Sequence, residues 1–182
     1  MNELYVLAVG EVDESAMRWA EAVAAEWFPF PVGRLHPLPT PDGSWDEARG
    51  QHRSVEIMKA VARAVPPGAA RVVGITEHDL SIPLLTFLFG QAQLDGPVAV
   101  VSLCRLRQEF YGFPANAELL KERLTKEMLH ELGHTFGLTH CSRRECAMSL
   151  ATHVEAVDSK GAGWCPDCGG HLARRFMSLQ KG

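Results

Sequence analysis

Residues 130–140 read HELGHTFGLTH, with histidines at positions 130, 134 and 140 and a glycine at position 137. In an α-helix, residues four positions apart are turned by about 40° and separated by about 6 Å along the axis. His130 and His134 therefore present their imidazoles side by side to one ion. Glu131 can lean toward the same region without taking a coordination position, and this arrangement makes HExxH a hydrolytic site.

The third ligand must come from beyond the helix. Gly137 supplies a break, because glycine adopts positive φ without steric cost, and the chain can then fold back so that His140 meets the ion. Three protein ligands and a water make an open, catalytic zinc site. Zinc would lower the pKa of that water toward ~7, and Glu131 would take its proton. A helix with two incidental histidines would explain HExxH alone, but it does not explain a third histidine past a glycine break.

The helix that carries this stretch is predicted to begin near Asn116. Leu124, Met128, Leu132 and Phe136 form an apolar stripe at helical spacing, which would seat the helix on the core. The two histidines fall on roughly the opposite side. We therefore expect the metal to face a cleft that the C-terminal segment covers in part.

Four of the five cysteines follow in two close pairs, Cys141 with Cys146 and Cys165 with Cys168. Each spacing lets both thiolates reach one ion, which predicts a closed four-cysteine zinc site with a structural role. A redox CxxC pair or disulfides would not account for all four cysteines in a cytosolic chain. Since Cys141 directly follows His140, the second metal would brace the loop that carries the third catalytic ligand.

Three further features concern the second cysteine pair, the fifth cysteine and the other histidines. Residues 165–170 read CPDCGG, which resembles a zinc knuckle in which glycines let backbone amides approach the sulfurs. Cys104 lies in an apolar segment and is interpreted as a buried small hydrophobic residue. His36, His52, His78, His153 and His171 have no partner at ligand spacing, so they are interpreted as surface or satisfied histidines.

The rest of the chain predicts an α/β fold with a mixed, partly antiparallel sheet flanked by helices. Strands are expected at residues 6–9, 32–38, 71–76, 84–89 and 98–106. Helices are expected from Asp13 to before Pro29, from about Ser54 to Pro66, and from Asn116 onward. We expect a single domain over residues 1–182. Within it, residues 1–137 carry the active-site helix, and residues 138–182 form a zinc-tied part with little core of its own.

Composition narrows the classes of function. The chain has 182 residues, 46% apolar and 22% charged, with a net charge of −4. These values are typical of a globular protein, and they lack the basic footprint of a nucleic-acid binder. The N-terminus is predicted to be a strand and not a signal peptide, and no apolar run approaches the ~20 residues of a membrane span. We expect a cytoplasmic monomer that binds neither nucleic acid nor membrane.

The extended pattern HExxHxxGxxH is typical of metzincins, and the following CxxxxC, Ala147-Met148 and CxxC resemble the archaemetzincins in particular. The resemblance extends upstream through residues 73–80 and 96–106. It implies Met148 as the methionine of the turn beneath the catalytic metal, although Met148 taken alone fits a core position equally well. Sixteen residues separate Met148 from Cys165, one fewer than is typical of the family.

By position, the resemblance implies two Zn²⁺ ions and a general base. It places a catalytic zinc on His130, His134 and His140, a structural zinc on Cys141, Cys146, Cys165 and Cys168, and the base at Glu131. The family pattern does not require the third histidine, so its presence here favours a competent site.

The leading interpretation is a zinc metallopeptidase that hydrolyses short peptides or unfolded chains. The family suggests aminopeptidase-like action, which needs an acidic group for the free amine, with Asp79, Glu155 and Asp158 as candidates. Residues 87–90 are either an edge strand for an extended peptide or a plain core strand, and residues 152–158 line the pocket by analogy. Two alternatives are a catalytically weak or inactive, zinc-containing peptide-binding or regulatory protein, and a zinc-ribbon interaction module.

Overall fold

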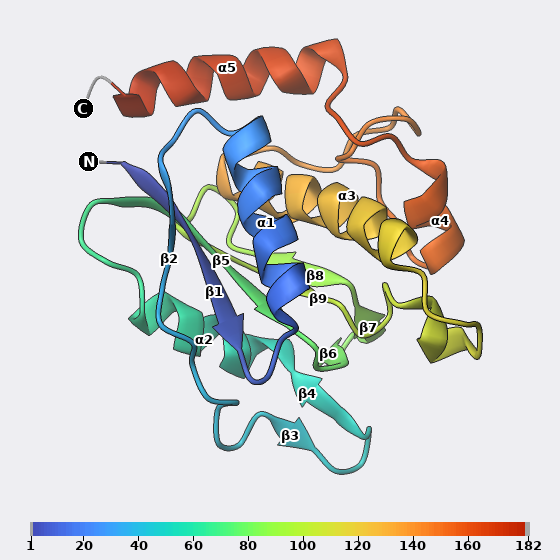
Figure 1. Ribbon diagram of the computed structural model, residues 1–182. Coiled ribbons are helices and arrows are strands. Elements are labelled where there is room, and N and C mark those ends of the chain that lie inside the picture. The colour runs from blue at the N-terminus through green and yellow to red at the C-terminus, as the bar shows by residue number, and fades with distance from the viewer. Residues whose placement is uncertain (1, 181–182) are drawn as a thin grey trace.

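The computed structural model describes residues 2–180 and shows an α/β architecture around a five-stranded sheet (Figure 1). In sheet order, its strands are β2 (Val32–Arg34), β1 (Glu3–Val9), β5 (Ala69–Thr76), β9 (Val98–Ser102) and β8 (Gly90–Ala92). The first four run parallel and β8 pairs antiparallel with β9, so the predicted mixed sheet is confirmed. The edge strand β8 lines one wall of the candidate site described below.

The central strands of this sheet are apolar almost without interruption. Every residue of β9 is buried, as is every residue of β5 after the first. Strands of a parallel sheet read this way because helices cover both of their faces, whereas a half-exposed strand would alternate. The runs at residues 71–76 and 98–102 therefore fix the centre of the sheet.

Helices cover both faces of the sheet, as Figure 1 shows. Their bounds are α1 (Glu14–Trp27), α2 (Ser54–Arg63), α3 (Ala117–Thr135), α4 (Val154–Ser159) and α5 (Pro166–Gln180), with the 3-10 helix η1 (Gln108–Tyr111). α1 and α3 pack on one face and α2 packs on the other, each with its own apolar core. The predicted starts of all three helices are confirmed to within one residue. No helix within residues 2–180 is long and apolar enough to cross a membrane.

A second, smaller sheet was not predicted. Its strands are, in order, β3 (Trp45–Asp46), β4 (Gln51–Arg53), β6 (Leu80–Ile82) and β7 (Leu85–Leu88). The single strand expected at residues 84–89 is thus divided, because β7 belongs to this sheet whereas β8 joins the central one. Figure 1 shows the small sheet below the central one, at the end where β1 points.

The strand expected at residues 98–106 is too long by four residues. β9 ends at Ser102, whose hydroxyl accepts a hydrogen bond from the backbone N–H of Cys104 at 3.2 Å. The next residues then form a turn, in which the N–H of Leu106 donates to the carbonyl of Leu103 at 3.0 Å. A local serine turn competes with strand pairing, and here it ends the strand.

The C-terminal part packs into the core of the main body. Ala147, Met148, Val157 and Leu172 are buried in the same cluster as α1 and α3. In Figure 1, α5 lies above α3 and crosses beyond the C-terminal end of α1. Phe176 of α5 packs edge-on against the Phe136 ring at the end of α3. The prediction of a zinc-knuckle loop at residues 165–170 is wrong, because residues 166–170 are the start of a helix. Pro166 starts α5, as proline often does at a first helical position, and the glycines lie inside the helix.

Candidate metal centre and substrate cleft

The helix α3 holds residues 130–134 in a well-packed setting. The Asn116 side chain accepts a hydrogen bond from the N–H of Leu119 at 3.0 Å, which caps the helix at its predicted start. Leu124, Met128 and Leu132 are fully buried, so the predicted apolar stripe is confirmed. The second half of the helix is buried on nearly all sides, which leaves its side chains little freedom to turn.

The chain reverses after α3 through the glycine break. Gly137 has a φ of 92°, which is the left-handed region that other residues enter only at a steric cost. The N–H of Leu138 donates to the carbonyl of Gly133 at 3.1 Å, and that of Gly137 donates to His134 at 3.0 Å. This pair of bonds is the Schellman motif, and it brings His140 back toward the helix.

The structure brings His130, His134 and His140 together. One ligand nitrogen of each lies within 4.8 Å of the others. The Nδ1 atom of His130 lies 2.9 Å from the carbonyl oxygen of Ala147, and that of His134 lies 2.7 Å from the carbonyl of Leu138. A carbonyl only accepts, so each Nδ1 must carry the proton and each Nε2 is left with a lone pair.

These lone pairs make the centre suited to a cation. The Nε2 atoms of His130 and His134 are 3.1 Å apart and neither has a proton to share, so they repel unless a positive ion lies near both. Burial, and then the charge of Lys160, lower the pKa of His130 to about 3. Burial also lowers the pKa of His134. Both rings are thus kept in the neutral form that binds metal.

Glu131 lies in the same cleft and is 6% exposed. Burial is the main cause that raises the pKa of its carboxyl group. The negative charge of Glu127 adds to this effect, whereas Lys160 opposes it. The Glu131 side chain rests against the edge strand: a Cβ atom built at Gly90 would lie 2.6 Å from its Cγ and 2.8 Å from its Oε1. Only a glycine at this position of β8 leaves room for the carboxylate.

Met148 lies against the turn of α3 between the two helical histidines. It is fully buried, and a Cβ atom at Gly133 would collide with its sulfur. Its carbonyl accepts a hydrogen bond from the N–H of Cys141 at 2.9 Å, and the preceding carbonyl, that of Ala147, orients His130. The Met148 segment therefore links the histidine cluster to the cysteine cluster.

The four predicted cysteines also come together, with ligand sulfurs within 4.8 Å of one another. The sulfurs of Cys141 and Cys165 are 3.8 Å apart, far beyond the ~2.05 Å of a disulfide. The backbone N–H of Cys168 is the main cause that lowers the pKa of Cys165 to about 7. The N–H of Cys165 in turn points to the sulfur of Cys146 at 3.4 Å. Such N–H···S contacts and close sulfurs suit thiolates on one cation.

The remaining histidines join neither cluster within residues 2–180. His52 and His78 stack with ring centroids 4.0 Å apart and contact the hydroxyl groups of Ser44 and Thr40. Both are satisfied, as predicted. Cys104 is half-buried, and burial raises its pKa to about 11, which keeps it a thiol.

The three histidines open onto a cleft of about 500 Å³. One wall consists of residues 85–92, in which β7 and the sheet edge β8 lie, and the opposite wall comes from α3 and the segment after Met148. Residues 87–90 thus line the cleft, and the backbone of β8 offers its outer edge there. From the predicted segment 152–158, only Thr152 lines the cleft, together with the unpredicted Leu150, Ala151 and Lys160.

The acidic candidates for binding a free amine lie elsewhere. Asp79 makes a two-pronged ion pair with Arg105 at 2.7 and 2.8 Å, and Asp158 makes one with Arg123 at 2.6 and 2.7 Å. Glu155 is exposed on α4, and none of the three lines the cleft. The acidic groups that do line it are Glu131 and Glu127, which is four residues earlier on α3.

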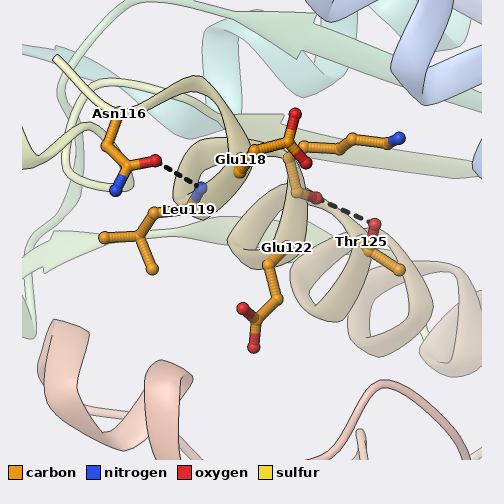
Figure 2. A pocket seen from close by; sticks show the side chains of 6 residues that line it. Asn116, Glu118, Leu119, Glu122 and Thr125 are labelled. Atoms are coloured by element: carbon orange, nitrogen blue, oxygen red, sulfur yellow. Dashed lines mark hydrogen bonds between the residues drawn. The ribbon is translucent and has the colours of Figure 1, made fainter.

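Figure 2 shows a different hollow, on the outer surface of the first half of α3. Its hydrogen bonds join Asn116 to the Leu119 N–H and the Thr125 hydroxyl to the Lys121 carbonyl, all within one helix. Five residues of α3 and its capping residue Asn116 line it, and none belongs to either candidate metal-binding cluster. The hollow therefore contributes no chemistry to the cleft.

Comparison with known proteins gives a consistent answer. The model of peptidase family M54 matches residues 54–174. The archaemetzincin of Methanocaldococcus jannaschii is 37% identical, over 88% of this chain and 87% of its own. The crystal structure of the Methanopyrus kandleri archaemetzincin superposes with a TM-score of 0.83, 33% identity, and coverage of 97% of this chain and 96% of its own. A zinc-dependent peptidase from Methanocorpusculum labreanum reaches a TM-score of 0.84 at 27% identity, covering 93% and 99%.

Proposed function

The chain belongs to peptidase family M54, the archaemetzincins, and on that premise we propose that it hydrolyses peptide bonds with Glu131 as the general base. The catalytic zinc would be held by His130, His134 and His140. The observation that carries the proposal is the convergence of one ring nitrogen from each of the three histidines beside a buried carboxylate in one cleft. Two of these nitrogens are the Nε2 atoms of His130 and His134, which have unshared lone pairs.

Different residues of the chain would have different roles in hydrolysis. When bound, zinc supplies Lewis-acid activation of the carbonyl group under attack. Glu131 takes the proton of the attacking water, and its raised pKa brings it closer to the working pH, where a base can also return the proton to the leaving amine. The carbonyls of Ala147 and Leu138 hold two ligand imidazoles in one tautomer.

The edge strand β8 gives the substrate a place to lie. An extended peptide can add to it as a further strand, since β8 is the last strand of the central sheet beside the cleft. The backbone would then set the scissile bond in front of Glu131 and the histidines. Specificity would come from the side chains that enter the cleft.

The second zinc is proposed on Cys141, Cys146, Cys165 and Cys168, with a structural role. Four thiolates leave no open position for a substrate. This zinc would tie residues 138–182 to α3 within one catalytic domain, because Cys141 adjoins the third histidine ligand.

Digestion of a defined peptide mixture tests the proposal. We expect the zinc-loaded protein to cut peptides, the chelator-treated protein to be inactive, and restored zinc to recover activity, with products identified by mass spectrometry. The cleavage positions will distinguish trimming of N-termini from internal cuts. If fully zinc-loaded protein binds the peptides and cuts none, the peptide-binding alternative replaces the peptidase.

Gly90→Ala is expected to lower kcat/KM by about 10²-fold, because a misplacement of about 1 Å in a catalytic group can cost that much. The added methyl group would lie 2.6 Å from the Glu131 Cγ and 2.7 Å from the backbone carbonyl of Val100. The carboxylate must therefore move. Steady-state hydrolysis of the best peptide measures the loss, and Gly170→Ala serves as the control because only the end of Arg174 lies near its new methyl group, at 3.7 Å. Equal activity of the two variants would contradict the assigned packing of Glu131.

A further inference from the structure

A buried ion pair lines the cleft beside the histidines. The Nζ atom of Lys160 lies 2.7 Å from the Oε1 atom of Glu127, and their side chains are only 2% and 4% exposed. Glu127 is one helical turn before Glu131, and Lys160 directly follows α4. Both residues line the cleft together with the three histidines. Neither residue of this pair has a role in the hydrolysis proposed above.

The pair has unused hydrogen-bonding capacity. Neither Lys160 Nζ nor Glu127 Oε1 makes a hydrogen bond of good geometry to any residue in the described part of the chain, although an ammonium group has three donors. Lys126 is buried on the same helix and is satisfied by the Asp158 carbonyl at 2.9 Å and by Glu122 at 2.6 Å. Lys160 Nζ and Glu127 Oε1 have each other as ion-pair partners at 2.7 Å, but their remaining hydrogen-bonding positions are not filled. Buried polar groups with unmade hydrogen bonds are costly, so this pair at the cleft is suited to bind a ligand that makes them.

The chemistry of the pair selects among side chains. An alkyl side chain would leave both charged groups unsatisfied. A carboxylate would meet Glu127 and Glu131, and an ammonium would meet Lys160 and the bound metal, so either charge is repelled. An amide carries an acceptor and a donor on one carbon, and it can accept from Lys160 while it donates to Glu127. Apolar Leu150 and Ala151 line the same cleft and suit its methylene groups.

We propose that Glu127 and Lys160 form a specificity-determining subsite for an uncharged amide side chain, glutamine or asparagine, next to the scissile bond. This proposal rests on the peptidase function proposed above and specifies its substrate class. The proposed subsite predicts a preference for a polar side chain. If the ion pair only neutralised itself and the rest of the cleft were apolar, the preferred side chain would instead be leucine. A site built to hydrogen-bond its substrate discriminates strongly against analogues that lack the bonding groups.

Four heptapeptides that differ at one position, with Gln, Leu, Glu or Lys, test the subsite on the zinc-loaded full chain. We expect kcat/KM for cleavage beside Gln to exceed the others by about tenfold or more. Calorimetric titration of the same peptides should rank their affinities in the same order, and it reports on the subsite even if turnover is slow. Cleavage or binding with no preference for Gln overturns the subsite but leaves the peptidase, whereas ranked binding without cleavage overturns the peptidase alone.

Variants of the pair separate recognition from stability. The double variant Glu127→Leu with Lys160→Met leaves no unpaired charge and is expected to fold, as circular dichroism and zinc content will show. Its preference should move from Gln to Leu. Lys160→Met alone should favour Lys, and Glu127→Gln alone should favour Glu. Lys126→Met is the control, since Lys126 does not line the cleft. A purely structural ion pair would change the unfolding temperature and leave the ranking of the four peptides as in the wild type.

Discussion

Glu131→Gln is expected to lower kcat/KM for peptide hydrolysis by about 10²–10⁴-fold, which is the usual contribution of a general base. Glutamine keeps the size of the side chain and its place against Gly90, but it cannot take a proton at neutral pH. Zinc content should not change, because Glu131 is not among the three converging ligands. Steady-state kinetics on the best peptide, with zinc measured by elemental mass spectrometry, checks both expectations.

The same substitution should leave stability equal or raise it. Burial raises the pKa of Glu131, which means that the folded protein disfavours its charged form. A neutral amide removes that cost. Glu118→Gln is the matched control, since Glu118 is exposed in the first turn of the same helix. If Glu131→Gln retained full zinc and more than about half of the wild-type activity, another group would have to be the base.

The active-site helix was predictable because its signals are local. The capping Asn116, the apolar stripe with a period near 3.6 and the break at Gly137 each act within a few residues, and the structure contains all three. The central strands were equally predictable, since residues 72–75 of β5 and 98–101 of β9 are apolar runs. In these segments, local preference and tertiary packing agree, so sequence alone indicates the element.

The missed elements depend on distant contacts. β3, β4 and β6 have two or three residues each, too few for an alternating pattern. The pairing of β4 with β6, which joins the two halves of the small sheet, connects segments about 30 residues apart. The helix α5 was not predicted, because Cys165, Cys168 and the two glycines that follow are typical of a metal-binding loop. Tertiary packing of Leu172 and Phe176 on the main body compensates for the weak helix preference of those glycines.

In the cleft, too, some residues could be predicted from local sequence and others depend on the tertiary fold. Its proposed metal ligands could be identified from their spacing in the sequence, but the other residues that line it come from separate segments of the chain. Asp79 and Asp158 looked free in the sequence, whereas in the fold each is paired with an arginine. Glu127 could have been found as the residue one turn before Glu131. Its partner Lys160 could not, because only the packing of α4 against α3 brings it there.

Cys165→Ser is expected to have the largest effect on stability. Structural zinc contributes about 10–16 kcal/mol of apparent binding free energy in small zinc domains, and a whole domain is typically stable by about 5–15 kcal/mol. Losing one of the four thiolates should therefore remove one zinc and lower the unfolding temperature steeply. Differential scanning calorimetry with zinc analysis measures both. Cys104→Ser is the control, because Cys104 lies outside both clusters and burial keeps it a thiol.

The order in which the two metals leave provides the sharper result. With the proposed ligands His130, His134 and His140, the catalytic site would be an open three-ligand site, so a chelator should extract this zinc first and abolish activity while the fold persists. The four-cysteine zinc should leave later, together with the unfolding transition. In Cys165→Ser the catalytic zinc should also bind more weakly, because Cys141 adjoins His140 and its N–H is held by the Met148 carbonyl. Simultaneous loss of both metals from the wild type, or unchanged affinity for the catalytic zinc in Cys165→Ser, would contradict a cysteine site that braces the third histidine.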